Sequence, residues 1–343
     1  MSGVVSSDTG AGALGIPHLR DLWSRTLAKR RNASQPPSVE EHVSHELSPF
    51  EKDKTVLFGL GLPLRETLSF LYEREPSYDE FERWIVERNG GSVDPRAVAR
   101  ITSALAGLPV EPIDDGVPAL TADELAFFDE HGFVVLRDAI DPAAARAAED
   151  AIWTHLRMDR DDPETWYAGA HGHSIWVPLI RHPALDANRA SPRIASAFAQ
   201  LWKRRDLWPT VDQTGFNPPE RPGWAFPGPN LHWDVSLALP IPFGLSGILH
   251  LVDTPAEQGA FTCVPGFHRR IESWLASLPP GADPRAEDLD ALGRVAVAAR
   301  AGDMVIWHQA LAHGASPNRG TRPRIVQYLS FNPLTQEKNP LWR

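Results

Sequence analysis

The sequence is poor in cysteine and has no excess of positive charge. Cys263 is the one cysteine among 343 residues, so an internal disulfide is excluded, and we expect a small buried thiol in a reducing compartment. The 34 basic residues are outnumbered by 44 acidic ones, which gives a formal net charge of -10. Broad binding to nucleic acid or to an anionic membrane needs a basic face, so neither is expected as a partner.

Long apolar runs are also missing. No stretch is long enough to span a bilayer, and the N-terminus lacks the basic region and apolar core of a secretory signal. Apolar residues nevertheless make up 42% of the chain, which suffices for a sizeable core. We therefore expect a cytoplasmic protein with one large domain or two ordinary ones.

The first third of the chain is predicted to be helical. Residues 1–37 are rich in Ser, Gly and Ala and are expected to form a partly ordered leader with a weak helical pattern. Helix starts are predicted at Ser38 with Glu41, at Ser77 with Glu80, and at Asp94 with Pro95. We interpret residues 38–117 as a helical layer on the following domain or, alternatively, as a docking surface for a carrier or partner protein.

Residues 118–343 form the second predicted domain, which begins after a loop rich in Pro, Gly and Asp. Short strands alternate there with Gly and Pro turns, so the predicted class is mainly β with α, built as a sandwich or barrel. The predicted strands are residues 133–136, 210–216, 232–239, 245–252, 259–264, 294–298, 303–307 and 324–331. Helices are predicted at residues 121–131 and 141–157, and helical character at 271–292.

His232 and Asp234 are candidate metal ligands. In an extended strand, side chains two residues apart point to the same face, so both can bind one ion. Two imidazoles and one carboxylate leave open positions for a cosubstrate and dioxygen, which suits iron(II). The third ligand must come from a distant segment. His313 is favoured over His308, because strand alternation puts His308 on the same face as the apolar side chain of Ile306.

Other histidine pairs are interpreted differently. His171 and His173 lie between glycines, which predicts a mobile loop that contacts the substrate or closes over it. His42 and His45 have helical spacing but no further ligand nearby, so we interpret them as part of a solvated helix face.

Several motifs, in their order and spacing, resemble the phytanoyl-CoA dioxygenase family of iron(II)- and 2-oxoglutarate-dependent oxygenases. They are residues 128–136, 232–234, 258–269, Gly302 with Asp303, His313 with Gly314, and Arg324. The resemblance covers residues 120–335 and does not reach the first 110 or so. It implies a double-stranded β-helix, or jelly roll, with iron(II) held by His232, Asp234 and His313 and with 2-oxoglutarate as cosubstrate.

The far carboxylate of 2-oxoglutarate needs a fixed cation. Arg324 suits this role, because guanidinium stays charged and can form two parallel hydrogen bonds, and we favour it over Arg322. The family often has Ser two residues after the distal histidine. This chain has Ala315 there and Ser316 next, so Ser316 is the candidate contact. Trp307, expected on the strand face opposite His308, is a candidate wall of the cosubstrate pocket.

The resemblance implies a 2-oxoglutarate-dependent dioxygenase that acts on a small-molecule substrate. Because relatives that halogenate have a small residue where this chain has Asp234, hydroxylation of an unactivated carbon is favoured over halogenation. Candidate walls of an aromatic substrate pocket are Trp166, Tyr167, His171, His173, Trp176 and Trp224. Two alternatives stay open. One is a non-catalytic metal- or ligand-binding β-helix protein that uses its N-terminal helices as a partner surface, and the other is a zinc hydrolase on the same ligands.

Overall fold

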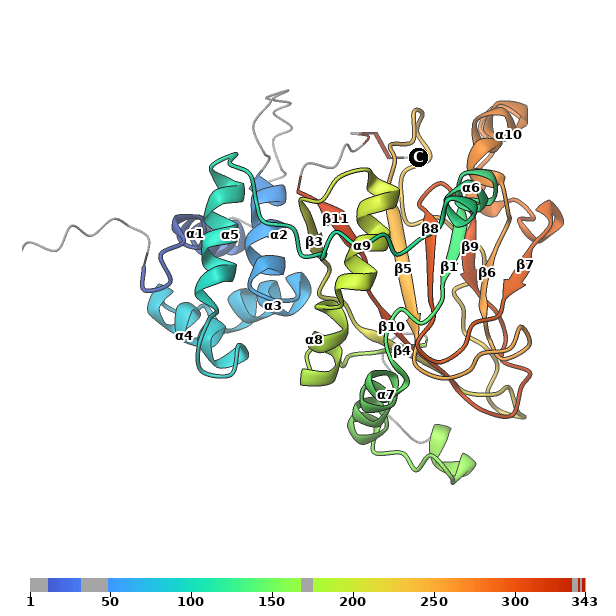
Figure 1. Ribbon diagram of the computed structural model, residues 1–343, viewed down its shortest axis with the longest axis horizontal. Helices are drawn as coiled ribbons and strands as arrows, with labels where there is room; N and C mark the ends of the chain where they lie inside the picture. The colour runs from blue at the N-terminus through green and yellow to red at the C-terminus, as the bar shows by residue number, and fades with distance from the viewer. Residues whose placement is uncertain (1–11, 32–48, 168–174, 335–338, 340, 343) are drawn as a thin grey trace, which may run out of the picture. The chain divides into compact units, whose positions relative to one another are not determined.

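The structure, a computed structural model, describes residues 12–31, 49–167, 175–334, 339, 341 and 342 (Figure 1). Its internal contacts define two compact units, one made mostly of residues up to Pro112 and the other mostly of residues from Ile113 onward. The boundary predicted at Pro118 stays a prediction. Among the described residues, no helix has the length and apolar character needed to cross a membrane.

The first unit is a helical bundle. Its helices are α1 (Pro17–Arg31), α2 (Pro49–Gly59), α3 (Leu64–Arg74), α4 (Tyr78–Arg88) and α5 (Pro95–Leu105). The predicted capping box at Ser77 and the predicted cap at Asp94 are both confirmed. The weak helical pattern of the expected leader corresponds to α1, which buries Leu19 and Leu22 in the bundle core. The predicted helix start at Ser38 and the His42 and His45 pair lie outside the described residues.

The second unit contains two larger antiparallel sheets. One has the order β1 (Phe133–Leu136), β8 (Met304–His308), β5 (Leu245–His250), β10 (Arg324–Tyr328), β4 (Thr214–Asn217) and β2 (Trp176–Val177). The other has the order β7 (Val295–Val297), β6 (Phe261–Cys263) and β9 (His313–Ala315). A further pair joins β3 (Leu207–Pro209) to β11 (Phe331–Pro333). The predicted combination of antiparallel sheets with helices is confirmed, and the described part of the chain is of mixed α/β class.

Helices cover one face of the six-stranded sheet. The helices of this unit are α6 (Ala122–His131), α7 (Pro142–Leu156), α8 (Pro183–Arg189), α9 (Pro192–Trp202) and α10 (Ile271–Ser277). Short 3-10 helices are η1 (Pro163–Tyr167), η2 (Phe267–Arg269), η3 (Pro284–Ala286) and η4 (Asp290–Leu292). Figure 1 shows α7, α8 and α9 on one side of the sheet and β6, β7 and β9 on the other.

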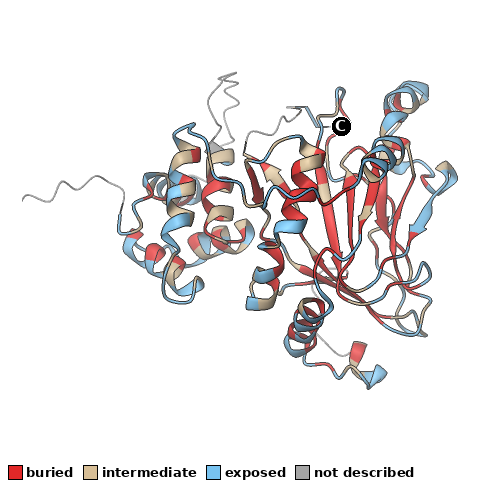
Figure 2. Cartoon of the chain, in the orientation of Figure 1, coloured by how far each residue is buried: buried red, intermediate tan, exposed pale blue. Residues whose placement is uncertain are grey.

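The alternation of side chains along β8 explains this layering. Met304 and Ile306 belong to the core beneath α7, α8 and α9, whereas Val305 and Trp307 belong to a second core that includes Phe261 of β6. Successive strand residues point to opposite faces, so one apolar strand can supply both cores. The central strands are accordingly buried along most of their length (Figure 2).

Two expectations for this unit are wrong. No helix was predicted between Trp166 and Leu207, but this region contains α8 and α9, and α9 starts at Ser191 with Pro192 at its first position. The strand predicted at residues 232–239 forms only one bridge, between His232 and His313. The carbonyl groups of Trp233 and Val235 accept hydrogen bonds from a guanidinium, not from a neighbouring strand, so the alternating pattern does not produce a ladder.

Candidate active site

Two of the predicted ligands are joined by the single bridge that replaces the predicted strand. His313 is the first residue of β9, and its main chain exchanges two hydrogen bonds with His232, at 2.8 and 3.1 Å. Gly314 allows this approach, because a Cβ there would lie 2.4 Å from the Asn230 carbonyl oxygen. The bridge sets the two imidazole rings side by side, with their centroids 4.7 Å apart.

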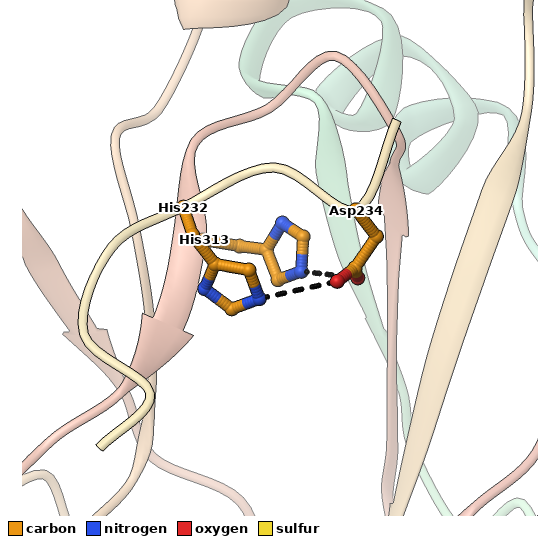
Figure 3. A group of neighbouring side chains, drawn as sticks. All are labelled: His232, Asp234 and His313. Atoms are coloured by element: carbon orange, nitrogen blue, oxygen red, sulfur yellow. Dashed lines mark hydrogen bonds and ion pairs between the residues drawn. The ribbon is translucent and has the colours of Figure 1, made fainter. Parts of the chain in front are cut away.

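Asp234 completes the group from the same irregular segment. Its carboxylate oxygens lie 3.3 Å from His232 Nε2 and 3.1 Å from His313 Nε2 (Figure 3). Arg285 fixes this segment by donating hydrogen bonds to the carbonyl groups of Trp233, at 2.7 Å, and Val235, at 2.6 Å. These carbonyl groups flank Asp234 on both sides, so one side chain holds the backbone that presents the carboxylate.

The hydrogen bonds of the two rings decide which nitrogen atoms face the carboxylate. His232 Nδ1 lies 2.7 Å from the Asn230 carbonyl oxygen, and His313 Nδ1 lies 3.0 Å from that of Leu311. A carbonyl oxygen only accepts, so each Nδ1 carries a proton, and each Nε2 is the atom that can give up its proton to bind a metal ion. Together with a carboxylate oxygen, these possible ligand atoms lie within 4.8 Å of one another, which is a set that a divalent metal ion fits.

Charges at this site are strongly coupled. Burial of Asp234 raises the pKa of its carboxyl group, but the hydrogen bonds with His232 and His313 outweigh burial and leave the pKa far below its ordinary value. Burial likewise lowers the pKa of His232, while the Asp234 carboxylate raises it, with a raised pKa as the result. Both shifts follow from a site that favours positive charge next to the carboxylate.

A cavity of about 280 Å³ opens beside the three ligands, and Arg324 lies in its wall. This arginine is 1% exposed, and its Nε and Nη1 atoms are buried without a hydrogen-bond partner among the described residues. An unpaired buried guanidinium is costly, so these donors fit a carboxylate that enters the cavity. The structure therefore places His232, Asp234, His313 and Arg324 around one cavity, and their roles as ligands stay a prediction.

Trp307 also lines the cavity, between the two sheets. Its ring centroid lies 4.9 Å from that of His313 and 4.7 Å from that of Phe261, so it forms part of the wall next to the ligands. Ser316 does not line the cavity, and its buried hydroxyl group donates to the Ala260 carbonyl oxygen at 3.1 Å. Its predicted contact with the cosubstrate gains no support from this placement.

The rival histidines lie elsewhere. His308 packs against Phe243 and His268, and burial lowers its pKa to about 4. His250 is fully buried, as expected of a core histidine, and burial lowers its pKa to about 3. His171 and His173 are outside the described residues.

Only some of the other residues predicted to line the site do so in the described part of the chain. Of the predicted aromatic wall, Trp176 lines the cavity, whereas Trp166 donates to the Asp159 carbonyl oxygen and Tyr167 stacks edge-on with Trp224 away from it. Cys263 is buried, as expected, and burial raises its pKa to about 12.

Sequence reasoning missed several residues of the site. Arg285 lies in the segment predicted only as a helical insertion, and nothing in the local sequence links it to Asp234. Asp212 and Tyr328 line the cavity because β4 and β10 are neighbours in the sheet, and that pairing cannot be derived from either segment alone.

Comparison with known proteins agrees with this site. The phytanoyl-CoA dioxygenase (PhyH) family model matches residues 128–326, more than half of the chain. A protein of Dictyostelium discoideum, provisionally named a phytanoyl-CoA dioxygenase, is 22% identical over 261 residues, which cover 61% of this chain and 74% of the relative.

The chain is also similar to solved structures. The non-heme alpha-ketoglutarate-dependent carbocyclase SnoK from nogalamycin biosynthesis is 20% identical with a TM-score of 0.46, over 66% of this chain and 90% of that one. EctD from S. alaskensis with bound Fe is 18% identical with a TM-score of 0.45, over 66% and 84%. On the evidence of the family match, the chain belongs to the phytanoyl-CoA dioxygenase family and is a 2-oxoglutarate-dependent oxygenase that uses iron.

Proposed function

We propose that the protein hydroxylates an unactivated carbon of a small metabolite, with iron(II) held by His232, Asp234 and His313. The distal carboxylate of 2-oxoglutarate pairs with Arg324 in this proposal. The observation that carries it is the convergence of three possible metal ligands beside a buried guanidinium whose Nε and Nη1 atoms have no hydrogen-bond partner among the described residues. We further propose that the two larger sheets form the double-stranded β-helix expected of the family, and that the protein is cytoplasmic, which its single thiol fits.

The cofactor supplies the oxidising chemistry when bound: one oxygen atom of dioxygen enters succinate, carbon dioxide leaves, and the other oxygen atom converts a C–H bond of the substrate to C–OH. The protein's own residues position the reactants. The two imidazoles and the carboxylate would hold the metal ion, and the cavity beside them would admit the substrate. Asp234 supports hydroxylation over halogenation, because its carboxylate fills the position that a halide would need.

The size of the cavity supports a small substrate. Its volume of about 280 Å³ lies just below the range for small-molecule sites, about 300–1,000 Å³, and 2-oxoglutarate must share it. Trp307 and Phe261 wall the metal side and keep water away from the reacting atoms. The formal net charge of -10 also disfavours an acyl-CoA, whose phosphates seek basic residues.

The direct test is succinate formation. Iron-loaded protein is incubated with 2-oxoglutarate and dioxygen, with and without a panel of small metabolites, and succinate and hydroxylated product are measured together. Product that appears in step with succinate supports the proposal, and a His232→Ala variant should form neither. Binding of iron and 2-oxoglutarate with no succinate for any metabolite would favour the non-catalytic alternative.

A further inference from the structure

We infer that the substrate of this oxygenase carries a positively charged amine group, which binds to Asp212 in the wall of the cavity. The inference rests on the proposed function, because it names the class of substrate for that same site. It depends on the position and bonding of the Asp212 carboxylate and on the aromatic rings beside it.

Asp212 lies just before β4, and its side chain is exposed to the cavity that it helps to line. One carboxylate oxygen accepts a hydrogen bond from the Gln213 main-chain N–H at 2.8 Å. The described residues contain no ion-pair partner within 4 Å of this carboxylate. The nearby Arg189 instead donates to the Asp212 main-chain carbonyl at 2.7 Å and pairs with Asp186 at 2.8 Å. The Asp212 carboxylate therefore keeps most of its capacity to accept hydrogen bonds.

The surroundings make this open carboxylate costly. Protein on its other sides desolvates Asp212 and raises its pKa, and the negative charge of Asp234 raises it further, although the Gln213 N–H and the charge of Arg189 act in the opposite direction. A carboxylate that is short of water and close to a second one is stabilised by a cation placed between it and the open cavity. No described lysine or arginine fills that place, so a ligand can.

A charge count of the loaded site leads to the same conclusion. Iron(II) with one carboxylate ligand has a net charge of +1, and 2-oxoglutarate with Arg324 has a net charge of -1. These charges cancel, so among the described residues that line the cavity the Asp212 carboxylate is left without an opposite charge. A cationic substrate neutralises it, whereas an anionic substrate is repelled.

Aromatic rings adjoin Asp212. Tyr328 is held next to it, because the Tyr328 N–H donates to the Gln213 carbonyl oxygen at 3.2 Å. The Tyr328 ring packs on that of Trp176 with centroids 4.3 Å apart, and both residues line the cavity. Gly215 makes room for the ring, because a Cβ there would lie 3.1 Å from Tyr328 Cε2. A carboxylate beside aromatic rings is a combination that binds ammonium groups, including alkylated ones.

The test compares cations with uncharged molecules of the same shape. Calorimetry under anaerobic conditions, on protein loaded with iron(II) and 2-oxoglutarate, measures the Kd of choline against 3,3-dimethylbutan-1-ol and of n-butylammonium against 1-butanol. The wild-type protein should bind at least one cation about tenfold more tightly than its uncharged counterpart, and added salt should reduce the preference. Asp212→Asn keeps the oxygen that accepts from Gln213 and should abolish the preference, whereas Asp129→Asn, at an exposed position on α6, should keep it.

Three outcomes overturn the inference: neither cation is preferred by the wild-type protein, Asp212→Asn keeps the preference, or Asp129→Asn loses it. The visible charge-transfer band of iron with 2-oxoglutarate is recorded on each sample before calorimetry. A missing band in the wild-type protein counts against the proposed function itself. A normal band without a cation preference counts only against the amine substrate.

Discussion

Arg285→Lys tests how the protein holds its metal ligands. Arg285 donates to the carbonyl groups of Trp233 and Val235, which flank Asp234, and this geometry uses two nitrogen atoms of one planar group. Lysine keeps the positive charge but has a single nitrogen atom, so it cannot reproduce the paired contact. Keeping the charge matters, because Arg285 also repels positive charge at His232, and its complete removal would mix that effect with the loss of geometry.

The expected loss of iron affinity is about tenfold. One hydrogen bond from a charged donor is worth about 1.5–3 kcal/mol in a protein. We expect the lysine to lose about one of the two hydrogen bonds, and a cost of about 1.4 kcal/mol in iron binding corresponds to a tenfold lower affinity. This is the lower end of the 10- to 100-fold losses seen when residues that support metal ligands are changed.

The assay is an anaerobic titration with iron(II), followed by the thermal unfolding of the metal-free protein. Arg294→Lys is the matched control, because Arg294 lies nearby in the sequence and pairs only with Asp290 on an exposed 3-10 helix. The control should keep the wild-type iron affinity. Wild-type affinity in Arg285→Lys, in protein that unfolds at the wild-type temperature, would refute a positioning role for Arg285.

Three further changes have definite expected results. Arg324→Met should weaken 2-oxoglutarate binding at least about 100-fold, while iron still binds. It should also stabilise the cosubstrate-free protein by about 1–4 kcal/mol, because a buried charge without an ion-pair partner among the described residues is removed. A lower unfolding temperature of the variant without cosubstrate would contradict this. Gly314→Ala should separate the bridged segments and reduce iron affinity together with stability, by about 1–3 kcal/mol, measured by calorimetry and urea unfolding. Burial raises the pKa of Asp303, but the Arg300 and Asp138 N–H groups and Arg137 lower it more. The pKa in the folded protein therefore lies below that in the unfolded chain. The stabilisation that Asp303 provides above pH 3.8 is lost as the pH falls through the folded pKa. Asp303→Asn should therefore unfold more easily at pH 7 and lose less stability on acidification, and an unchanged pH profile would contradict the account.

The sequence could single out the candidate ligands, which the structure places close together, because each lies in a short segment with its own signal. His313 follows the apolar strand β8, and Arg324 is the first residue of the apolar strand β10. The alternation of side chains along these strands could therefore be derived from the sequence. The same reasoning predicted a strand at residues 232–239, which the structure lacks. The candidate ligands nevertheless lie close together, because two sets of contacts hold the segment in place of strand pairing. These are the β-bridge between His232 and His313 and the hydrogen bonds that Arg285 donates to the carbonyl groups of Trp233 and Val235.

Other features could not be predicted for physical reasons. Asp212 reaches the cavity through the pairing of β4 with β10, whose sequences are more than 100 residues apart. The bundle of the first unit buries Leu19 and Leu22 by packing between helices, which a weak local pattern understates. The helix α9 differs from these cases, since Ser191 followed by Pro192 is a local start signal that was available.

The most direct test of the central claim compares two histidines five positions apart. Iron(II) is titrated anaerobically, with 2-oxoglutarate present, into the wild-type protein and into the His313→Ala and His308→Ala variants, and the visible charge-transfer band is recorded. The account predicts one iron per chain and a band in the wild-type and His308→Ala proteins, with iron affinity reduced at least about 100-fold in His313→Ala. Wild-type affinity in His313→Ala, or loss of the band in a folded His308→Ala protein, would contradict it.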